Sequence, residues 1–116
     1  MIPRLVTSIL FITFFAATSV EQKQGCDINQ EVYKNPSRSD MLVKMEFTDG
    51  CQDADSYVYA YDASNKQTAV YTVPDMKTKI FHIDVPAGGS IKFNCRGTGH
   101  NTSGACSSRL ISADAE

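Results

Sequence analysis

The sequence predicts an all-β protein, built as one small antiparallel β-sandwich or barrel of six to seven strands and stapled by two disulfides. Three observations predict this fold class. Apolar residues recur at every second position along much of the chain, turn-forming residues interrupt these stretches at short intervals, and four cysteines follow an apolar leader. With 116 residues the chain can enclose one hydrophobic core, so a single domain is expected after the leader.

Residues 1–19 are predicted to be a secretory signal peptide. Arg4 supplies a positive start, residues 5–15 form an apolar run, and the small residues Ala17 and Ser19 precede the expected cleavage site, with cleavage after Thr18 as the alternative. The apolar run is shorter than the ~20 residues that a membrane-spanning helix requires. We therefore expect a secreted, extracellular domain over residues 20–116, with no membrane span.

The most regular alternation in the chain begins after residue 40. Met41, Val43, Met45 and Phe47 form an apolar row, and mostly polar residues occupy the positions between them. This period of two is typical of a strand with one buried face and one solvated face.

Polar segments are expected to form the loops. Residues 35–40 and 51–56 are rich in Asp, Ser and Asn, and Asp49 with Gly50 is a turn signal at the end of the preceding strand. Residues 112–116 are expected to be a frayed tail, because they bury too little surface to offset the entropy of ordering them. No amphipathic helix of useful length is found.

The remaining strands follow at the spacing typical of an antiparallel sandwich or barrel. They are expected at residues 28–33, 57–61, 67–73, 79–85, 90–95 and 107–112. The strands at 79–85 and 90–95 are separated by Pro86, Ala87, Gly88 and Gly89, which predicts a β-hairpin at this point.

All four cysteines, Cys26, Cys51, Cys95 and Cys106, lie after the leader, as expected for a protein of an oxidising compartment. Four cysteines allow three pairings. The predicted strands favour Cys26–Cys51 and Cys95–Cys106, because in each case an antiparallel pair of consecutive strands would bring the two residues together. Each bond is expected to contribute roughly 2–4 kcal/mol by restricting the unfolded chain.

The charge balance argues against a nucleic-acid partner. Without Arg4 of the leader the chain has 10 basic against 13 acidic residues, a net charge near −3. No basic cluster exceeds two neighbouring charges, whereas proteins that neutralise phosphates carry a basic patch.

Residues 96–105 form the first candidate binding feature. This segment is polar and rich in glycine, and a Cys95–Cys106 bond would pre-organise it for a partner. Its candidate contact residues are Arg96, Thr98, His100 and Asn101. The alternative is an ordinary connection between strands. Asn101-Thr102-Ser103 is also an N-glycosylation sequon in a eukaryotic protein, and a glycan there would cover part of the segment.

A row of tyrosines is the second candidate. Tyr57, Tyr59 and Tyr61 occupy alternate positions of one predicted strand, so they share a face. Facing solvent, the row would stack on sugars or anchor a protein, because tyrosine joins a flat apolar body to a polar tip. Facing inward, it would belong to the core. Tyr71 on the next strand would extend the row if it shares that face, but the register is not fixed by the sequence.

The strongest catalytic alternative is a small secreted ribonuclease-like hydrolase that uses His82 and His100 as acid–base groups. Its companion residues would be Glu46, Asp84 and either Arg96 or Arg109. His82 is expected on the solvent side of its strand, where an isolated histidine is usually an ordinary surface residue. A metal site from the cysteines and histidines is disfavoured, because the short Cys-x-x-Cys and His-x-x-x-His spacings are absent. We therefore expect no catalysis, no cofactor and no metal.

These observations predict the general function rather than the partner. The chain is expected to be a small secreted, disulfide-stabilised binding protein of the effector, toxin or inhibitor type. Its partner would be an extracellular protein or glycan.

Overall fold

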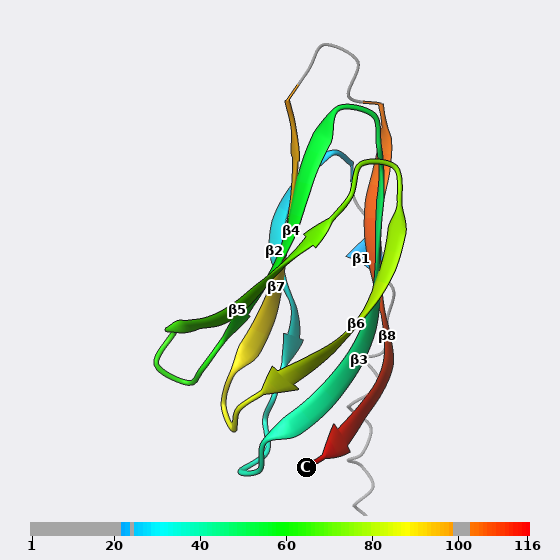
Figure 1. The fold of residues 1–116 in the computed structure, drawn as a ribbon. Helices are drawn as coiled ribbons and strands as arrows, with labels where there is room; N and C mark the ends of the chain where they lie inside the picture. The colour runs from blue at the N-terminus through cyan, green and yellow to red at the C-terminus, as the bar shows by residue number, and fades with distance from the viewer. Residues whose placement is uncertain (1–21, 24, 99–102) are drawn as a thin grey trace, which may run out of the picture.

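The structure, a computed structural model, describes residues 22–23, 25–98 and 103–116. It is a two-layer sandwich of β-strands (Figure 1). The strands are β1 (Gln22–Lys23), β2 (Asp27–Lys34), β3 (Met41–Cys51), β4 (Ala54–Tyr61), β5 (Gln67–Val73), β6 (Thr78–Val85), β7 (Ser90–Gly97) and β8 (Gly104–Ala115). The predicted leader, residues 1–19, lies outside the described residues.

The eight strands form two antiparallel sheets. One has the order β1-β8-β3-β6 and the other the order β2-β7-β4-β5. The pairs β1 with β8, β2 with β7, β3 with β6 and β4 with β5 are nested inside one another, which is the strand order of a jelly roll. The predicted all-β sandwich is thus confirmed, with seven longer strands and the two-residue β1. The described residues contain no helix that could cross a membrane.

The core lies between the sheets and follows the period of two. Along β3 the predicted inward row is buried, with Val43, Met45 and Phe47 at most 1% exposed. The Phe47 ring meets the Phe93 ring of β7 edge to face across the two layers, with centroids 5.0 Å apart. Such aromatic pairs add to the stabilisation from buried apolar area, so this contact helps to hold the two sheets together in the middle of the sandwich.

The hairpin predicted at residues 86–89 is wrong. A tight turn does form there, with the Gly89 N–H donating to the Pro86 carbonyl at 2.8 Å, but the flanking strands lie in different sheets. β6 pairs with β3, whereas β7 pairs with β2 and β4. The turn residues therefore reverse the chain between layers, and turn chemistry alone does not distinguish this arch from a hairpin.

The predicted turn at Asp49 and Gly50 is also wrong, because β3 continues to Cys51 and only residues 52–53 connect it to β4. Asp49 is fully buried, and its carboxylate accepts hydrogen bonds from the Cys51 N–H at 3.0 Å and from the Ser56 hydroxyl at 2.8 Å. A Cβ on Gly50 would collide with the Ala105 carbonyl of β8. Glycine is therefore needed for the close approach of two strands.

The frayed tail predicted for residues 112–116 is ordered strand instead. β8 extends to Ala115 and pairs with the first half of β3, from Met41↔Ala115 to Lys44↔Ser112. The Glu116 N–H then donates to the Asp40 carbonyl at 3.0 Å. Backbone pairing along a central strand orders this segment although its side chains bury little apolar surface.

Both predicted disulfides are confirmed, but neither spans a hairpin. Cys26–Cys51 joins the start of β2 to the end of β3, and Cys95–Cys106 joins β7 to β8. Each bond therefore links one sheet to the other. The sulfur atoms of Cys51 and Cys106 are 3.7 Å apart, so the two bonds form one compact cross-link at the end of the sandwich where β3 ends.

The opposite end is closed by a buried side chain, Asn35, which is fully enclosed in the loop between β2 and β3. Its Nδ2 group donates to the carbonyl oxygens of Ser39, Val85 and Pro86 at 2.9, 3.0 and 3.0 Å. Its Oδ1 atom accepts from the N–H and hydroxyl of Ser37. One amide thus ties the β2–β3 loop to the end of β6.

Replacing Met76 with Asn is expected to raise the free energy of unfolding by about 0.5–1 kcal/mol. Met76 lies in the β5–β6 connection at φ 60° with 57% of its surface exposed. Asn tolerates this left-handed backbone better than Met, and little packing is lost. Urea denaturation of both proteins measures the change. The matched control is Asn65→Met at φ 64°, which should lower the free energy of unfolding. If both variants changed the free energy of unfolding in the same direction, the prediction would be contradicted.

Candidate functional site

The tyrosine row on β4 faces outward, which the sequence had left open. Val58 and Ala60, which alternate with the tyrosines, are fully buried. Tyr57 is 36% exposed, and Tyr59 and Tyr61 are partly exposed. We call the outer surface of the sheet β2-β7-β4-β5 around these three residues the tyrosine face.

The three rings form an evenly spaced ladder along one strand. The Tyr57 and Tyr59 centroids are 6.3 Å apart with an interplanar angle of 35°, and the Tyr59 and Tyr61 centroids are 6.3 Å apart at 36°. The Lys92 Nζ atom lies 5.7 Å from the centroid of the Tyr61 ring, within the range of a cation–π contact. The ladder is therefore a regular aromatic surface with a positive charge beside one end.

Polar side chains flank the ladder on the neighbouring strands. Tyr57 is opposite Asn94 of β7, which is in turn opposite Asn29 of β2; Tyr59 is likewise opposite Lys92, which is opposite Glu31. The sequence did not identify these neighbours. Alternation within residues 90–95 puts Lys92 and Asn94 on one face of the strand, but only the strand order puts β7 between β4 and β2.

Two shallow hollows lie on the same face, one toward each end of the ladder. The larger, about 330 Å³, is at the disulfide end and is lined by Asp27, Ile28, Asn29, Asn94, Cys95 and Arg96. The other, about 300 Å³, is lined by Glu31, Tyr61, Asn65, Ser90 and Lys92. Together the ladder and hollows make an elongated, open surface.

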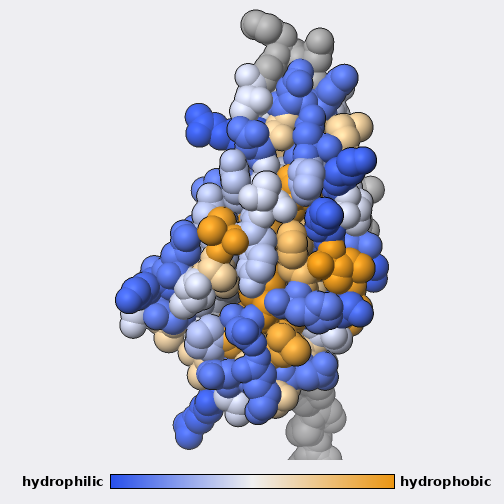
Figure 2. All heavy atoms as spheres, viewed as in Figure 1, coloured by the Kyte–Doolittle hydropathy of each residue, from blue (hydrophilic) through white to orange (hydrophobic). Residues whose placement is uncertain are grey.

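Tyr71 does not extend the row, because it is opposite the inward-facing Val58. Its ring packs instead against Phe81 of β6, with centroids 4.9 Å apart, across the edge where β5 and β6 run side by side. Burial, together with the negative charge of Asp84, raises the pKa of the Tyr71 phenol. That side of the molecule shows separate apolar patches among polar side chains rather than one apolar surface (Figure 2).

The predicted binding segment, residues 96–105, is divided by the structure. Arg96 belongs to β7, is exposed and borders the larger hollow, so it joins the tyrosine face. Thr98 is held against the β3–β4 turn, because its N–H and hydroxyl donate to the Asp53 carbonyl at 2.8 and 2.9 Å. His100 and Asn101, the acceptor residue of the sequon, lie outside the described residues.

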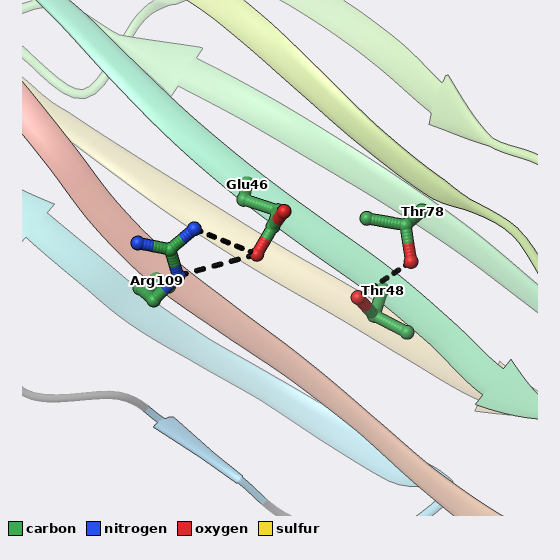
Figure 3. A network of polar contacts seen from close by, with 4 residues as sticks. All are labelled: Glu46, Thr48, Thr78 and Arg109. Carbon is green, nitrogen blue, oxygen red and sulfur yellow. Dashed lines mark hydrogen bonds and ion pairs between the residues drawn. The ribbon is translucent and has the colours of Figure 1, made fainter.

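The outer face of the other sheet has a different character, because several of its polar side chains bind each other. Glu46 of β3 pairs with Arg109 of β8 at 3.1 Å, and the Thr48 and Thr78 hydroxyls are 2.9 Å apart (Figure 3). The exposed apolar residues of this face, Leu42 and Ile80, lie on adjacent strands.

The structure brings only some of the residues proposed for ribonuclease-like chemistry to one face. His82 and Asp84 are exposed at alternate positions of β6, whereas Arg96 is exposed on the other sheet. Glu46 and Arg109 lie on the same sheet as His82 but pair with each other. Among the described residues, this face therefore holds one of the two proposed acid–base histidines.

The cysteines also form no thiolate site. Ligand atoms of Asp49, Cys51, Cys95 and Cys106 lie within 4.8 Å of one another. All four cysteine sulfurs are in disulfides, however, and the thiolate is the form that binds metals. The Asp49 carboxylate already accepts hydrogen bonds from the Cys51 N–H and the Ser56 hydroxyl. Its role is therefore structural, at the end of β3.

Comparison with known proteins identifies no family for this chain. No family model matches the sequence, and no curated protein matches it. Among solved structures, a mutant VP2 protein of infectious bursal disease virus in T=1 particles has a TM-score of 0.39 and 10% identity over 82% of this chain. The VP2 subviral particle of that virus gives 0.38 and 11% over 82%. This chain spans only 28% and 29% of those two chains.

Proposed function

We propose that this protein is a small extracellular binding protein whose contact surface is the tyrosine face. The observation that carries the proposal is the ladder itself, three tyrosines in a row that all face outward from a strand with a fully buried opposite side. Tyrosine offers a large contact area with few rotatable bonds, so it loses little conformational entropy on binding. It is also among the residues most enriched at binding hot spots.

The rigidity of the surrounding sheet supports this role. β4 lies between β7 and β5, so its backbone is paired on both sides. The Cys95–Cys106 bond ties β7 to the second sheet, and the Phe47–Phe93 contact packs behind β7. A surface that is already ordered gives up little freedom when a ligand binds, which raises the affinity obtained from a given contact area.

An extracellular location is part of the proposal. Two disulfides persist in an oxidising compartment, and the sequence predicts a signal peptide over residues 1–19. Binding is favoured over catalysis because Arg96 lies on the opposite sheet from His82 and because Glu46 and Arg109 are paired with each other, whereas the three tyrosines share one surface.

Replacing Tyr57 and Tyr59 together with Ala is expected to reduce ligand capture by roughly tenfold or more, the loss expected when hot-spot contacts are truncated. The purified protein would be immobilised and exposed to extracellular extracts of its source and of any host organism. Retained material would then be quantified and mapped by crosslinking.

The matched control is the double variant Leu42→Ala and Ile80→Ala, which removes exposed apolar side chains from the opposite face. It should capture as much ligand as the unaltered protein. Circular dichroism would show that both variants stay folded. Equal capture by the tyrosine variant and the unaltered protein would exclude the tyrosine face as the contact surface.

A further inference from the structure

We infer that the ligand of the tyrosine face is an uncharged polysaccharide chain, lying along β4 with its sugar rings over Tyr57, Tyr59 and Tyr61. This inference rests on the proposed function, because it names the ligand class of the same surface. Four features of the face support it: its periodicity, its polar neighbours, its charge and its open shape.

The periodicity of the ladder suits a polymer of repeating rings. The two centroid spacings are equal at 6.3 Å, and the two tilts differ by a single degree. A sugar ring presents a flat array of C–H groups that packs against an aromatic face, and a polysaccharide repeats that array along its length. Three equally spaced rings along one strand therefore offer contacts to successive units of one extended chain.

A folded protein partner fits this surface less well. Protein interfaces place apolar residues at the centre and charged residues at the rim. Here the charged residues Lys92 and Glu31 lie in the same cross-strand row as the central Tyr59, and the Lys92 Nζ atom lies 5.7 Å from the centroid of the Tyr61 ring. Charged side chains therefore border two of the three rings rather than only the rim of the face. The exposed apolar neighbour, Val70 at 50%, is opposite Tyr59 on the edge strand β5.

The polar neighbours suit hydroxyl groups. Asn29, Asn94 and Thr72 lie in one row with Tyr57 across the four strands. Amide and hydroxyl side chains both donate and accept hydrogen bonds, as sugar hydroxyls do. A sugar ring stacked on Tyr57 would therefore have such groups on both sides of it.

The charge of the face argues for a neutral chain. Three basic residues, Lys34, Lys92 and Arg96, are matched in number by three acidic ones, with Glu31 beside Lys92 and with Asp27 and Asp55 on either side of Arg96. The Lys34 Nζ group donates to the Gly88 carbonyl at 2.9 Å. Attraction of a sulfated, phosphorylated or uronic-acid polymer requires a surplus of positive charge. The described residues of this face provide none.

The surface beside the ladder is open. The hollows of about 330 and 300 Å³ lie along β2 and β7, one beside the Tyr57 row and the other beside the Tyr59 and Tyr61 rows. This shape admits an internal segment of a long chain, whereas a site for a single sugar or a chain end would be enclosed. The structure therefore points to a polymer rather than to a monosaccharide.

In the deciding experiment, the extract is treated in one of two ways before it is exposed to the immobilised protein. A mixture of chitinase, cellulase, mannanase and β-1,3-glucanase breaks down neutral polysaccharides, and a broad-specificity protease removes proteins. A polysaccharide ligand should be lost after the glycosidase mixture and retained after protease. Capture that survives the glycosidase mixture or disappears after protease overturns the inference while leaving the proposed function intact, provided that capture still depends on Tyr57 and Tyr59. Capture that does not depend on them overturns both.

Defined probes make the test independent of extracts. Cosedimentation with insoluble chitin, cellulose, mannan and β-1,3-glucan should show binding to at least one neutral polymer that persists at high salt, because no counterion is released. Tyr59→Ala should weaken that binding roughly tenfold, whereas Tyr59→Phe, which keeps the ring, should stay within about threefold. Binding to none of these four neutral polymers, or equal loss in both Tyr59 variants, would overturn the inference.

Discussion

Replacing Asn35 with Asp is expected to lower the free energy of unfolding by about 3–4 kcal/mol at neutral pH. The wild-type Nδ2 group donates to the carbonyl oxygens of Ser39, Val85 and Pro86, all within 3.0 Å. An aspartate oxygen in that place would face three oxygens and would bring a charge into a fully buried site. The substitution therefore replaces attraction by repulsion without changing the size of the side chain.

Urea denaturation at pH 7 would measure this loss. The control is Asn29→Asp, the same chemical change on the exposed surface of β2, which should alter stability by less than about 0.5 kcal/mol. Lowering the pH should recover part of the stability of Asn35→Asp, because a protonated carboxyl can donate one hydrogen bond. A loss no larger than that of the control would show that Asn35 does not hold the β2–β3 loop to β6.

Removing the disulfides is expected to have the second large effect. The Cys26–Cys51 bond closes a loop of 25 residues and the Cys95–Cys106 bond one of 11. From loop entropy, replacing the first pair with Ala should cost about 3.5 kcal/mol and the second about 2.8 kcal/mol. The quadruple variant would then lose about 6 kcal/mol, which is comparable with the whole stability of a small domain.

Chemical denaturation of the two double variants tests the order of these costs, and circular dichroism tests whether the quadruple variant folds. The Cys26 and Cys51 variant should be the less stable of the two. If the Cys95 and Cys106 variant were less stable instead, the stabilisation would come from packing of the linked sulfurs at the end of the sandwich rather than from loop entropy. A folded quadruple variant would show that the core suffices without either bond.

Local patterning made most strands and both disulfides predictable. Alternation along residues 41–48 identified β3 and its buried row, and the positions of the cysteines beside consecutive strands gave the right pairs. The reason for the pairing was different, since consecutive strands here mostly lie in opposite sheets. Adjacent strand ends can meet across a hairpin or across the two layers, and both arrangements place the cysteines together.

Long-range partners explain what the sequence did not predict. The residues from Pro86 to Gly89 are typical of a hairpin turn. However, β6 pairs with β3 at eight positions instead of pairing with β7. The C-terminal residues 112–115 are ordered by pairing with the same strand, β3. Asp49 is buried because its carboxylate accepts hydrogen bonds from the Ser56 hydroxyl and the Cys51 N–H. On the candidate site, alternation grouped the three tyrosines, but their outward direction and the neighbours Lys92 and Asn94 depend on strand order.

The nested strand order has a consequence for how the chain folds. Only β4 and β5 are consecutive strands that pair directly; every other pairing joins segments separated by at least two intervening strands. Such non-local pairing slows folding, because each contact requires a long loop to close first. We expect folding on the millisecond-to-second scale typical of β-sandwiches, with the β4–β5 hairpin forming early. The strand that carries the tyrosine ladder would thus be the template on which β7 and then β2 assemble.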